Sequence, residues 1–189
     1  NIVYIGAAAG GIWKTTNSGQ SWKAIFDFEN ASSFGALCID PNNSSIIYAA
    51  TGEMVIGGGI PYFGNGIYKS SDAGDTWFQI GLTEVAAFAK IYVHPQNSNL
   101  IYTAGAIRNG GVYKSTNAGV SWEKMYDGNI TDISINPKNI NEIYAGANTI
   151  GVIYSYDGGK SWDLRSVGLN ELAGRVSVQG FSEDFGIVY

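Results

Sequence analysis

One eight-residue pattern occurs four times in this chain and constrains its fold more than any other feature. Each copy reads hydroxyl residue, any residue, Asp or Asn, small residue, Gly, any residue, hydroxyl residue, Trp. In a tight turn the Asp or Asn side chain can accept hydrogen bonds from backbone amides two residues on, the Gly accepts a positive φ, and the Trp begins a strand. We therefore expect four β-hairpins that share one turn geometry. The copies span residues 15–22, 70–77, 115–122 and 155–162.

A second phrase lies upstream of three of these turns. It consists of a polar residue, Pro, another polar residue and Asn, and it leads into an apolar strand that contains a Tyr. These tyrosines are Tyr48, Tyr102 and Tyr144, and Tyr4 and Tyr189 fill the same slot near the two ends. Subtracting their residue numbers gives spacings of 44, 54, 42 and 45 residues. A period of roughly 40–50 residues is typical of a propeller blade with four strands.

Each unit resolves into four short strands that are rich in β-branched and aromatic residues and bounded by Gly, Pro, Asn or Ser. In the second unit we expect them at 35–40, 46–51, 66–70 and 76–80. The predicted fold class is therefore all-β, a β-propeller of four-stranded antiparallel blades. About four blades are present, both end blades are incomplete, and we expect them to belong to a larger propeller or to an open arc. The units span about 1–26, 33–80, 86–126 and 129–165, and a fifth starts at 174–189.

Composition and charge narrow the classes of partner. The chain has 189 residues, 45% of them hydrophobic, and a net charge of −5. It has no basic run, so we expect no nucleic-acid partner, and no apolar run approaches the ~18 residues that cross a bilayer, so we expect no membrane insertion. The single cysteine, Cys38, cannot form an intrachain disulfide. The single histidine, His94, precedes a turn proline and is interpreted as a turn residue, so we predict no metal site, no cofactor and no Ser-His-Asp triad.

At these turns the sequence resembles the Asp-box (BNR) repeat proteins, and we therefore call the eight-residue pattern the Asp-box. That group includes sortilin-like domains, xyloglucanase-type glycoside hydrolases, sialidases and large secreted bacterial repeat proteins, and the chain looks most like the last of these. The resemblance implies a propeller outside the cell or on its surface. The same scaffold carries enzymes and binding modules, so the resemblance implies no single activity.

Catalytic residues of this group are missing at the matching positions. In the xyloglucanase-type family a catalytic Asp precedes a Gly-Gly-aliphatic-aromatic-basic strand; here that strand is 10–14, and Ala7, Ala8 and Ala9 precede it. A second catalytic Asp would lie outside this segment. The chain has only three arginines, at unequal positions of different units, which does not match the arginine cluster of sialidases. We predict no catalytic residue here, and enzymatic activity stays open with the balance against it.

Because neighbouring strands of a blade are antiparallel, alternate connections along the chain lie at the same end of the blade. The Pro-containing turns and the Asp-boxes share one end, where every unit repeats the others, so we interpret the Asp-box residues as structural. The loops at the opposite end, which we call the variable rim, differ from unit to unit, and this favours function there. The structural Asp-box residues are Asn17, Gly19, Trp22, Asp72, Gly74, Trp77, Asn117, Gly119, Trp122, Asp157, Gly159 and Trp162.

The second unit carries an insertion over residues 52–65 of the variable rim, with two adjacent aromatic residues. Their rings could stack on a sugar or anchor a protein, or they could only pin the loop onto the third unit. The acids of the rim could pair for glycoside chemistry or be ordinary solvated charges, and Arg108 could bind a carboxylate or offset those acids. The candidate binding residues are Glu53, Tyr62, Phe63, Asn65, Asp27, Glu29, Glu84, Arg108 and Asp127.

These observations lead us to expect a non-catalytic recognition or scaffold propeller outside the cell, which binds a protein or a polysaccharide through the variable rim. One alternative is a glycoside hydrolase, xyloglucanase-like or sialidase-like, with catalytic acids partly outside this segment. Another alternative is a structural spacer in a large secreted surface protein. The rest of a larger chain or complex is a further expected partner.

Overall fold

The computed structural model describes residues 1–26, 31–54, 62–167 and 174–180. These residues form antiparallel β-sheets and contain no helix, so within them nothing helical could cross a membrane. Asp27, Glu29 and Tyr189, which the sequence analysis singled out, lie outside the described residues.

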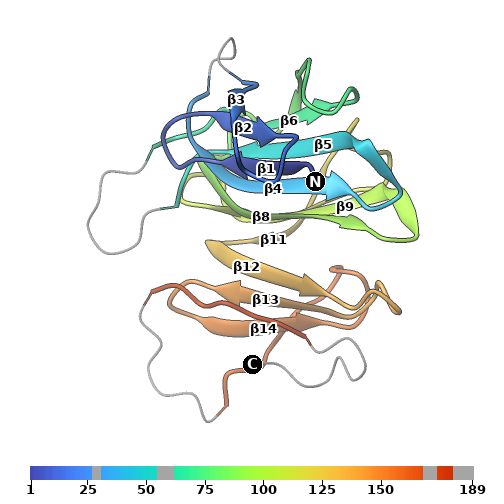
Figure 1. Cartoon of the computed structure of the whole chain (residues 1–189). Helices are drawn as coiled ribbons and strands as arrows, with labels where there is room; N and C mark the ends of the chain where they lie inside the picture. Colours follow the sequence, from blue (N-terminus) through green and yellow to red (C-terminus); the bar gives the residue numbers. More distant parts are fainter. Residues whose placement is uncertain (27–30, 55–61, 168–173, 181–189) are drawn as a thin grey trace.

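Four sheets follow one another along the chain, from the blue N-terminal sheet at the top of Figure 1 to the orange sheet at the bottom, and we call them blades 1 to 4. Blades 2 to 4 each have four strands hydrogen-bonded in sequence order, as successive hairpins produce, and blade 1 has three. The prediction of an all-β fold with about four antiparallel blades is confirmed.

Blade 1 contains β1 (Val3–Gly6), β2 (Ile12–Thr15) and β3 (Lys23–Ala24), and blade 2 contains β4 (Phe34–Asp40), β5 (Asn43–Thr51), β6 (Ile67–Ser70) and β7 (Phe78–Gly81). Blade 3 contains β8 (Ala87–His94), β9 (Asn97–Ala106), β10 (Gly111–Ser115) and β11 (Glu123–Asp127), and blade 4 contains β12 (Ile130–Ile135), β13 (Ile143–Ala147), β14 (Gly151–Ser155) and β15 (Asp163–Leu164).

The hydrophobic core lies in layers between the blades. Side chains alternate between the two faces of a strand. In β5, Ile47 and Ala49 pack in a cluster with Ile12 of blade 1, whereas Tyr48 and Ala50 belong to a second cluster that reaches blade 3. A third cluster joins blades 3 and 4. Stacking is therefore what allows blades 2 and 3, each a single thin sheet, to bury both of their faces.

The strand limits of the second unit differ most from the sequence prediction at the starts of β5 and β7. β5 begins at Asn43 rather than at residue 46, because Asp40 still pairs with Asn43 across the turn. In each blade the Trp lies just before the outermost strand instead of beginning it, since the Asp-box hydrogen bonds hold the backbone up to the preceding residue. The outermost strands β3 and β15 are only two residues long, whereas the outermost strands β7 and β11 have four and five residues.

Hydrogen bonds confirm that the Asp-boxes and the Pro-containing turns share one end of the blades. The fourth residue of each Asp-box donates its backbone N–H to the neighbouring turn of the same blade. Ala73 donates to the Ser45 carbonyl at 2.8 Å, and Ala118 donates to the Asn99 carbonyl at 3.0 Å. The loops of the variable rim therefore lie at the other end.

Candidate functional site

The Asp-boxes share one hydrogen-bond scheme that is centred on their first hydroxyl group. In blade 2 the Ser70 Oγ donates to Asp72 Oδ1 at 2.8 Å and accepts the Gly74 N–H at 2.8 Å. Asp72 Oδ1 accepts the Thr76 N–H, also at 2.8 Å. The carboxylate therefore binds the amide four residues on rather than two, because the amide of Gly74 is already bonded to Ser70. The same bonds recur in the other three blades.

Asp and Asn are interchangeable in this scheme because the second side-chain atom pairs with a rotatable hydroxyl group. Asp72 Oδ2 accepts a bond from Thr76 Oγ1 at 2.5 Å, whereas Asn117 Nδ2 donates to Ser121 Oγ at 2.8 Å. A hydroxyl can serve as donor or as acceptor. The bonds from the Thr76 side chain and backbone lower the pKa of Asp72 to about 2. The carboxylates of Asp72 and Asp157 are hydrogen-bonded within their own turns and lie at the end opposite the variable rim. A structural role predicts this arrangement.

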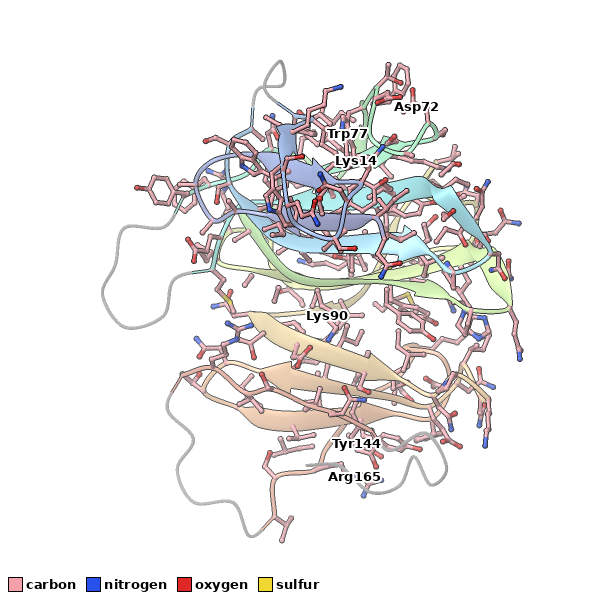
Figure 2. The ribbon with its side chains drawn as sticks, in the orientation of Figure 1. Lys14, Asp72, Trp77, Lys90, Tyr144 and Arg165 are labelled. Carbon is pink, nitrogen blue, oxygen red and sulfur yellow. The ribbon has the colours of Figure 1, made fainter. Side chains whose placement is uncertain are left out.

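The Asp-box Trp side chains of blades 2, 3 and 4 fasten each of these blades to the blade before it. Trp77 Nε1 donates to the Ile25 carbonyl of blade 1 at 2.9 Å, and Trp122 Nε1 donates to the Ile80 carbonyl of blade 2 at 3.1 Å. The joint between blades 3 and 4 repeats this contact. Figure 2 shows Trp77 near Lys14, where blades 1 and 2 meet.

The variable rim is a row of loops joined by hydrogen bonds from blade to blade. Gly64 in the β5–β6 loop donates its N–H to the Ala86 carbonyl at 2.8 Å, and Ala86 donates to the Arg108 carbonyl in the β9–β10 loop at 3.0 Å. Ile107 donates its N–H to Asn129 Oδ1 of the β11–β12 connection at 2.7 Å. The loops of blades 2, 3 and 4 therefore hold fixed positions relative to one another and form a continuous surface.

Two aromatic rings stand on this surface. Tyr62 is 54% exposed and Phe63 is 57% exposed. The Arg108 guanidinium lies over the Phe63 ring, 5.8 Å from its centroid, and its Nε donates to the Glu84 carbonyl at 3.4 Å. The insertion therefore does contact blade 3, as expected if the two aromatic residues pin the loop onto the third unit. Each of these two residues nevertheless keeps more than half of its surface open to solvent and available to a ligand.

The polar candidates of the insertion have different surroundings. The Glu53 N–H donates to the Tyr62 carbonyl at 2.9 Å, which ties the two sides of the insertion together. No other described residue bonds the partly buried Glu53 carboxylate. Asn65, by contrast, donates from Nδ2 to Tyr68 Oη at 3.0 Å and from its N–H to Thr51 Oγ1 at 2.9 Å. Asn65 is thus occupied in shaping the loop, and Glu53 is the residue whose charge faces no described partner.

The remaining acids of the rim are not equivalent. Glu84 is exposed and uses its carbonyl to hold Arg108. Asp127 is also exposed but forms an ion pair with Lys124, so its charge is offset within blade 3. The structure therefore brings Glu53, Glu84 and the Tyr62, Phe63 and Arg108 group together over blades 2 and 3. The sequence-predicted positions Asp27 and Glu29 lie outside the described residues.

Two amide side chains that the sequence analysis did not select also shape the rim. Gln79 Nε2 donates to the Asn65 carbonyl at 2.6 Å, and Asn109 Nδ2 donates to the Glu84 carbonyl at 3.1 Å. Asn109 has a positive φ of 53°. An Asn before two glycines is a usual signal for that conformation and could have identified it. No comparable signal pointed to Gln79, because its role depends on the fold that brings β7 beside the insertion.

The alanine stretch at 7–9 in blade 1 and His94 at the end of β8 supply no catalytic group. The Ala7 to Ala9 stretch acts through its backbone, since Ala7 accepts the Phe34 N–H at 3.1 Å. His94 is buried, and its Nδ1 accepts the Gln96 N–H at 3.1 Å, which is the bond of a turn residue. Among the described residues, no group of three or more His, Cys, Asp and Glu side chains is arranged to hold a metal ion.

Known proteins share both the repeat and the fold. Residues 153–164 match the BNR/Asp-box repeat. The chain is 33% identical over 138 residues to a xyloglucanase of Hypocrea jecorina (strain QM6a), an alignment that covers 66% of this chain and 16% of that protein. It is 28% identical over 164 residues to a xyloglucanase of Acetivibrio thermocellus, which covers 66% of this chain and 18% of that protein. A GH74 enzyme of Niastella koreensis superposes with a TM-score of 0.69 at 23% identity, over 86% of this chain and 27% of that chain. The chain thus spans less than a fifth of the length of these curated relatives.

Proposed function

This chain is a BNR/Asp-box repeat propeller similar to those of xyloglucanases, and from that premise we propose that it belongs to a glycoside-hydrolase propeller that binds a polysaccharide along its variable rim. The observation that carries the proposal is the pair of exposed rings, Tyr62 and Phe63, beside Arg108 on a rim whose loops are bonded from blade to blade. A polysaccharide ligand implies a location outside the cell.

The chemistry of the rim suits a sugar polymer. The apolar face of a pyranose ring stacks on an aromatic ring, as Tyr62 and Phe63 permit. Sugar hydroxyl groups both donate and accept hydrogen bonds, so the Glu53 carboxylate can accept from them and the Arg108 guanidinium can donate to them. Because the loops are joined into one surface, a chain of several sugar units can lie across blades 2 and 3.

Hydrolysis would need at least one catalytic carboxyl group from outside these residues. Glycosidases use two carboxyl groups about 5–10 Å apart. Alanines occupy the matching catalytic stretch at 7–9, and Asp127 is paired with Lys124. This chain therefore supplies binding groups and at most part of a carboxylate pair, with Glu53 and Glu84 as the rim acids whose carboxylates have no hydrogen-bond partner among the described residues.

A second function is non-catalytic recognition of the same class of ligand. The missing carboxylate at Ala7, Ala8 and Ala9 favours it, because a propeller that lacks one catalytic acid can still hold a glycan through aromatic stacking.

Electrophoresis of the 189-residue chain through gels that contain xyloglucan tests the binding. We expect retention by xyloglucan, and at least a ~10-fold weaker retention after Tyr62→Ala with Phe63→Ala, since central aromatic anchors dominate binding. Tyr156→Ala is the matched control, because Tyr156 is 59% exposed but lies in an Asp-box at the other end. Unchanged retention of the double variant would refute the rim as the site.

Release of reducing sugar separates the two functions. Turnover by the wild-type chain that is lost in Glu53→Gln, with retention unchanged, supports the hydrolase. Retention without any product supports recognition alone. If the chain neither binds nor cleaves any soluble glucan, xylan or mannan in a panel of these polysaccharides, both proposed functions are contradicted.

A further inference from the structure

Arg108 carries a positive charge on the variable rim that no described carboxylate pairs with. The ion pairs among the described residues join Lys90 to Asp132, Lys124 to Asp127 and Arg165 to Asp163. None of them includes Arg108. Glu84 contacts the guanidinium through its backbone carbonyl and not through its carboxylate. Of the two roles considered for Arg108, offsetting the rim acids is therefore not the one that the described residues show.

The Arg108 side chain is held on two sides and open on a third. Its guanidinium lies over the Phe63 ring, 5.8 Å from the centroid, and its Nε donates to the Glu84 carbonyl at 3.4 Å. A guanidinium has five N–H donors, and Nε accounts for only one of them. No described residue accepts a bond from the two terminal nitrogens, and the residue is exposed. These terminal N–H groups are therefore available to a ligand.

The backbone that carries Arg108 is held in a strained conformation. Ile107 and Asn109 have φ values of 70° and 53°, and a positive φ is an outlier for a β-branched residue such as Ile107. Ile107 donates its N–H to Asn129 Oδ1 at 2.7 Å, and the Arg108 carbonyl accepts the Ala86 N–H at 3.0 Å. Strain of this kind persists where the surroundings over-determine the backbone, and it collects at ligand sites. The conformation is thus a second, independent sign that Arg108 is placed for a ligand.

A guanidinium held in this way favours a carboxylate over a hydroxyl group. Its planar fork of donors matches the two oxygens of a carboxylate, and such charge-assisted bonds are roughly twice as strong as neutral ones. Because the side chain is already fixed by Phe63 and Glu84, little conformational entropy is lost when the ligand binds. Arg108 can therefore distinguish an acidic sugar from a neutral one.

The acids beside Arg108 limit how much negative charge a ligand can carry. The carboxylates of Glu53 and Glu84 have no hydrogen-bond partner among the described residues. Sugar hydroxyl groups can donate to these carboxylates, whereas a polymer with an acid on every unit would be repelled by them. The rim therefore suits a polymer of mainly neutral sugars that carries scattered acidic units.

We propose that Arg108 is the specificity-determining residue of the rim and binds the carboxylate of a uronic acid unit in a largely neutral polysaccharide. Neighbouring neutral units stack on the exposed parts of Tyr62 and Phe63, and their hydroxyl groups donate to Glu53. This inference rests on the proposed polysaccharide binding and deepens it, because it names the chemical class of the ligand.

Electrophoresis through gels that contain a matched pair of polymers tests the inference. Glucuronoxylan carries scattered uronic acids on a neutral backbone, and chemical reduction of its carboxyl groups to alcohols removes only the charge. We expect the wild-type chain to be retained at least ~10-fold more strongly by the intact polymer, since one charge-assisted interaction is worth about that factor. The chain has a net charge of −5, so general attraction would not favour the acidic polymer. Neutral xyloglucan measures in parallel whether the rim binds uncharged sugars.

Three variants assign the preference to one side chain. Arg108→Gln should lower retention by intact glucuronoxylan to that of the reduced polymer, and it should leave retention by xyloglucan within ~3-fold of the wild type. Arg108→Lys keeps the charge without the fork of donors, and it should recover less than half of the preference. Lys160→Gln is the matched control. It removes one positive charge from an exposed position of the blade 4 Asp-box, at the other end, and should leave the preference unchanged.

Equal retention of the wild-type chain by intact and reduced glucuronoxylan overturns the inference, and this comparison needs no variant. If the chain still binds xyloglucan in that case, the proposed function stands and only the role of Arg108 fails. If it binds no polysaccharide, both fail. The inference is also overturned if Lys160→Gln loses the preference as Arg108→Gln does. It is likewise overturned if polygalacturonate, with an acid on every unit, retains the chain more strongly than glucuronoxylan, because the rim acids then set no limit.

Discussion

The two ends of the blades are built from the same strands but are held together by different groups. At the Asp-box end, side chains satisfy the backbone: the glycine N–H meets the first hydroxyl at 2.8 to 3.0 Å in all four copies. At the variable rim, the loops of neighbouring blades are joined through backbone groups such as those of Gly64, Ala86 and Arg108. The first arrangement prescribes residue types, and the second leaves the side chains free to differ. This division explains why one end repeats and the other can acquire a binding site.

The largest expected effect comes from removing a tryptophan that fastens two blades. Trp77→Ala deletes a buried ring and its bond to the Ile25 carbonyl, and we expect a loss of about 3–5 kcal/mol in the free energy of unfolding. Trp22→Ala is the matched variant, and its exposed ring should cost well under half as much. Urea unfolding followed by circular dichroism measures both. Equal losses would mean that the two tryptophans are equally packed.

A smaller effect is expected from the hydroxyl at the centre of an Asp-box. Ser70→Ala leaves the Gly74 N–H without its acceptor in a buried position, which should lower the free energy of unfolding by about 1–3 kcal/mol. Ser71→Ala, at the exposed neighbouring position, is the control and should have little effect. A Ser70 variant as stable as the control would show that the turn holds without this bond.

The Asp-boxes that carry Asp should make stability depend on pH where those that carry Asn do not. Hydrogen bonds from Thr76 and Ser161 lower the pKa values of Asp72 and Asp157 to about 2, from a usual value of 3.8. Their contribution is complete above pH 3.8 and is lost as the pH falls through about 2. Asp72→Asn with Asp157→Asn should therefore flatten the fall in unfolding temperature between these values. Parallel curves for variant and wild type would contradict this assignment.

The smallest expected change in stability belongs to the rim. Tyr62→Ala with Phe63→Ala removes two rings that are more than half exposed, so the free energy of unfolding should change by no more than about 0.5 kcal/mol. Thermal unfolding of this double variant should thus overlay that of the wild type even where xyloglucan binding is weakened. A large loss of stability would mean that the rings serve the fold instead of a ligand.

Much of the fold could be predicted because its signals are local. The Asp-box specifies a turn within eight residues, and the regular position of Tyr48 and its equivalents sets the blade period. The joints between blades could not be predicted in the same way. Trp77 bonds to Ile25 and Lys14 bonds to Ala73 across more than fifty residues of chain, so only the stacked structure reveals these pairs.

The rim was predictable in position but not in detail. Strand parity placed Glu53 and Asn65 at the same end, yet Asn65 is occupied by Tyr68 and Thr51, whereas the Glu53 carboxylate has no described partner. Similarly, no sequence pattern pairs Arg108 with Phe63, because their contact depends on where Phe63 lies against blade 3 in the folded chain.

The rotatable hydroxyl in each Asp-box has a consequence for how this protein ages. Asn17 and Asn117 stand in exposed turns, where water can reach the side-chain amide and hydrolyse it to an acid. Ser21 and Ser121 need only turn their protons toward the new oxygen to restore the bonding already seen at Asp72 and Asp157. Loss of ammonia at either asparagine by this direct route would add a negative charge and leave the turn intact.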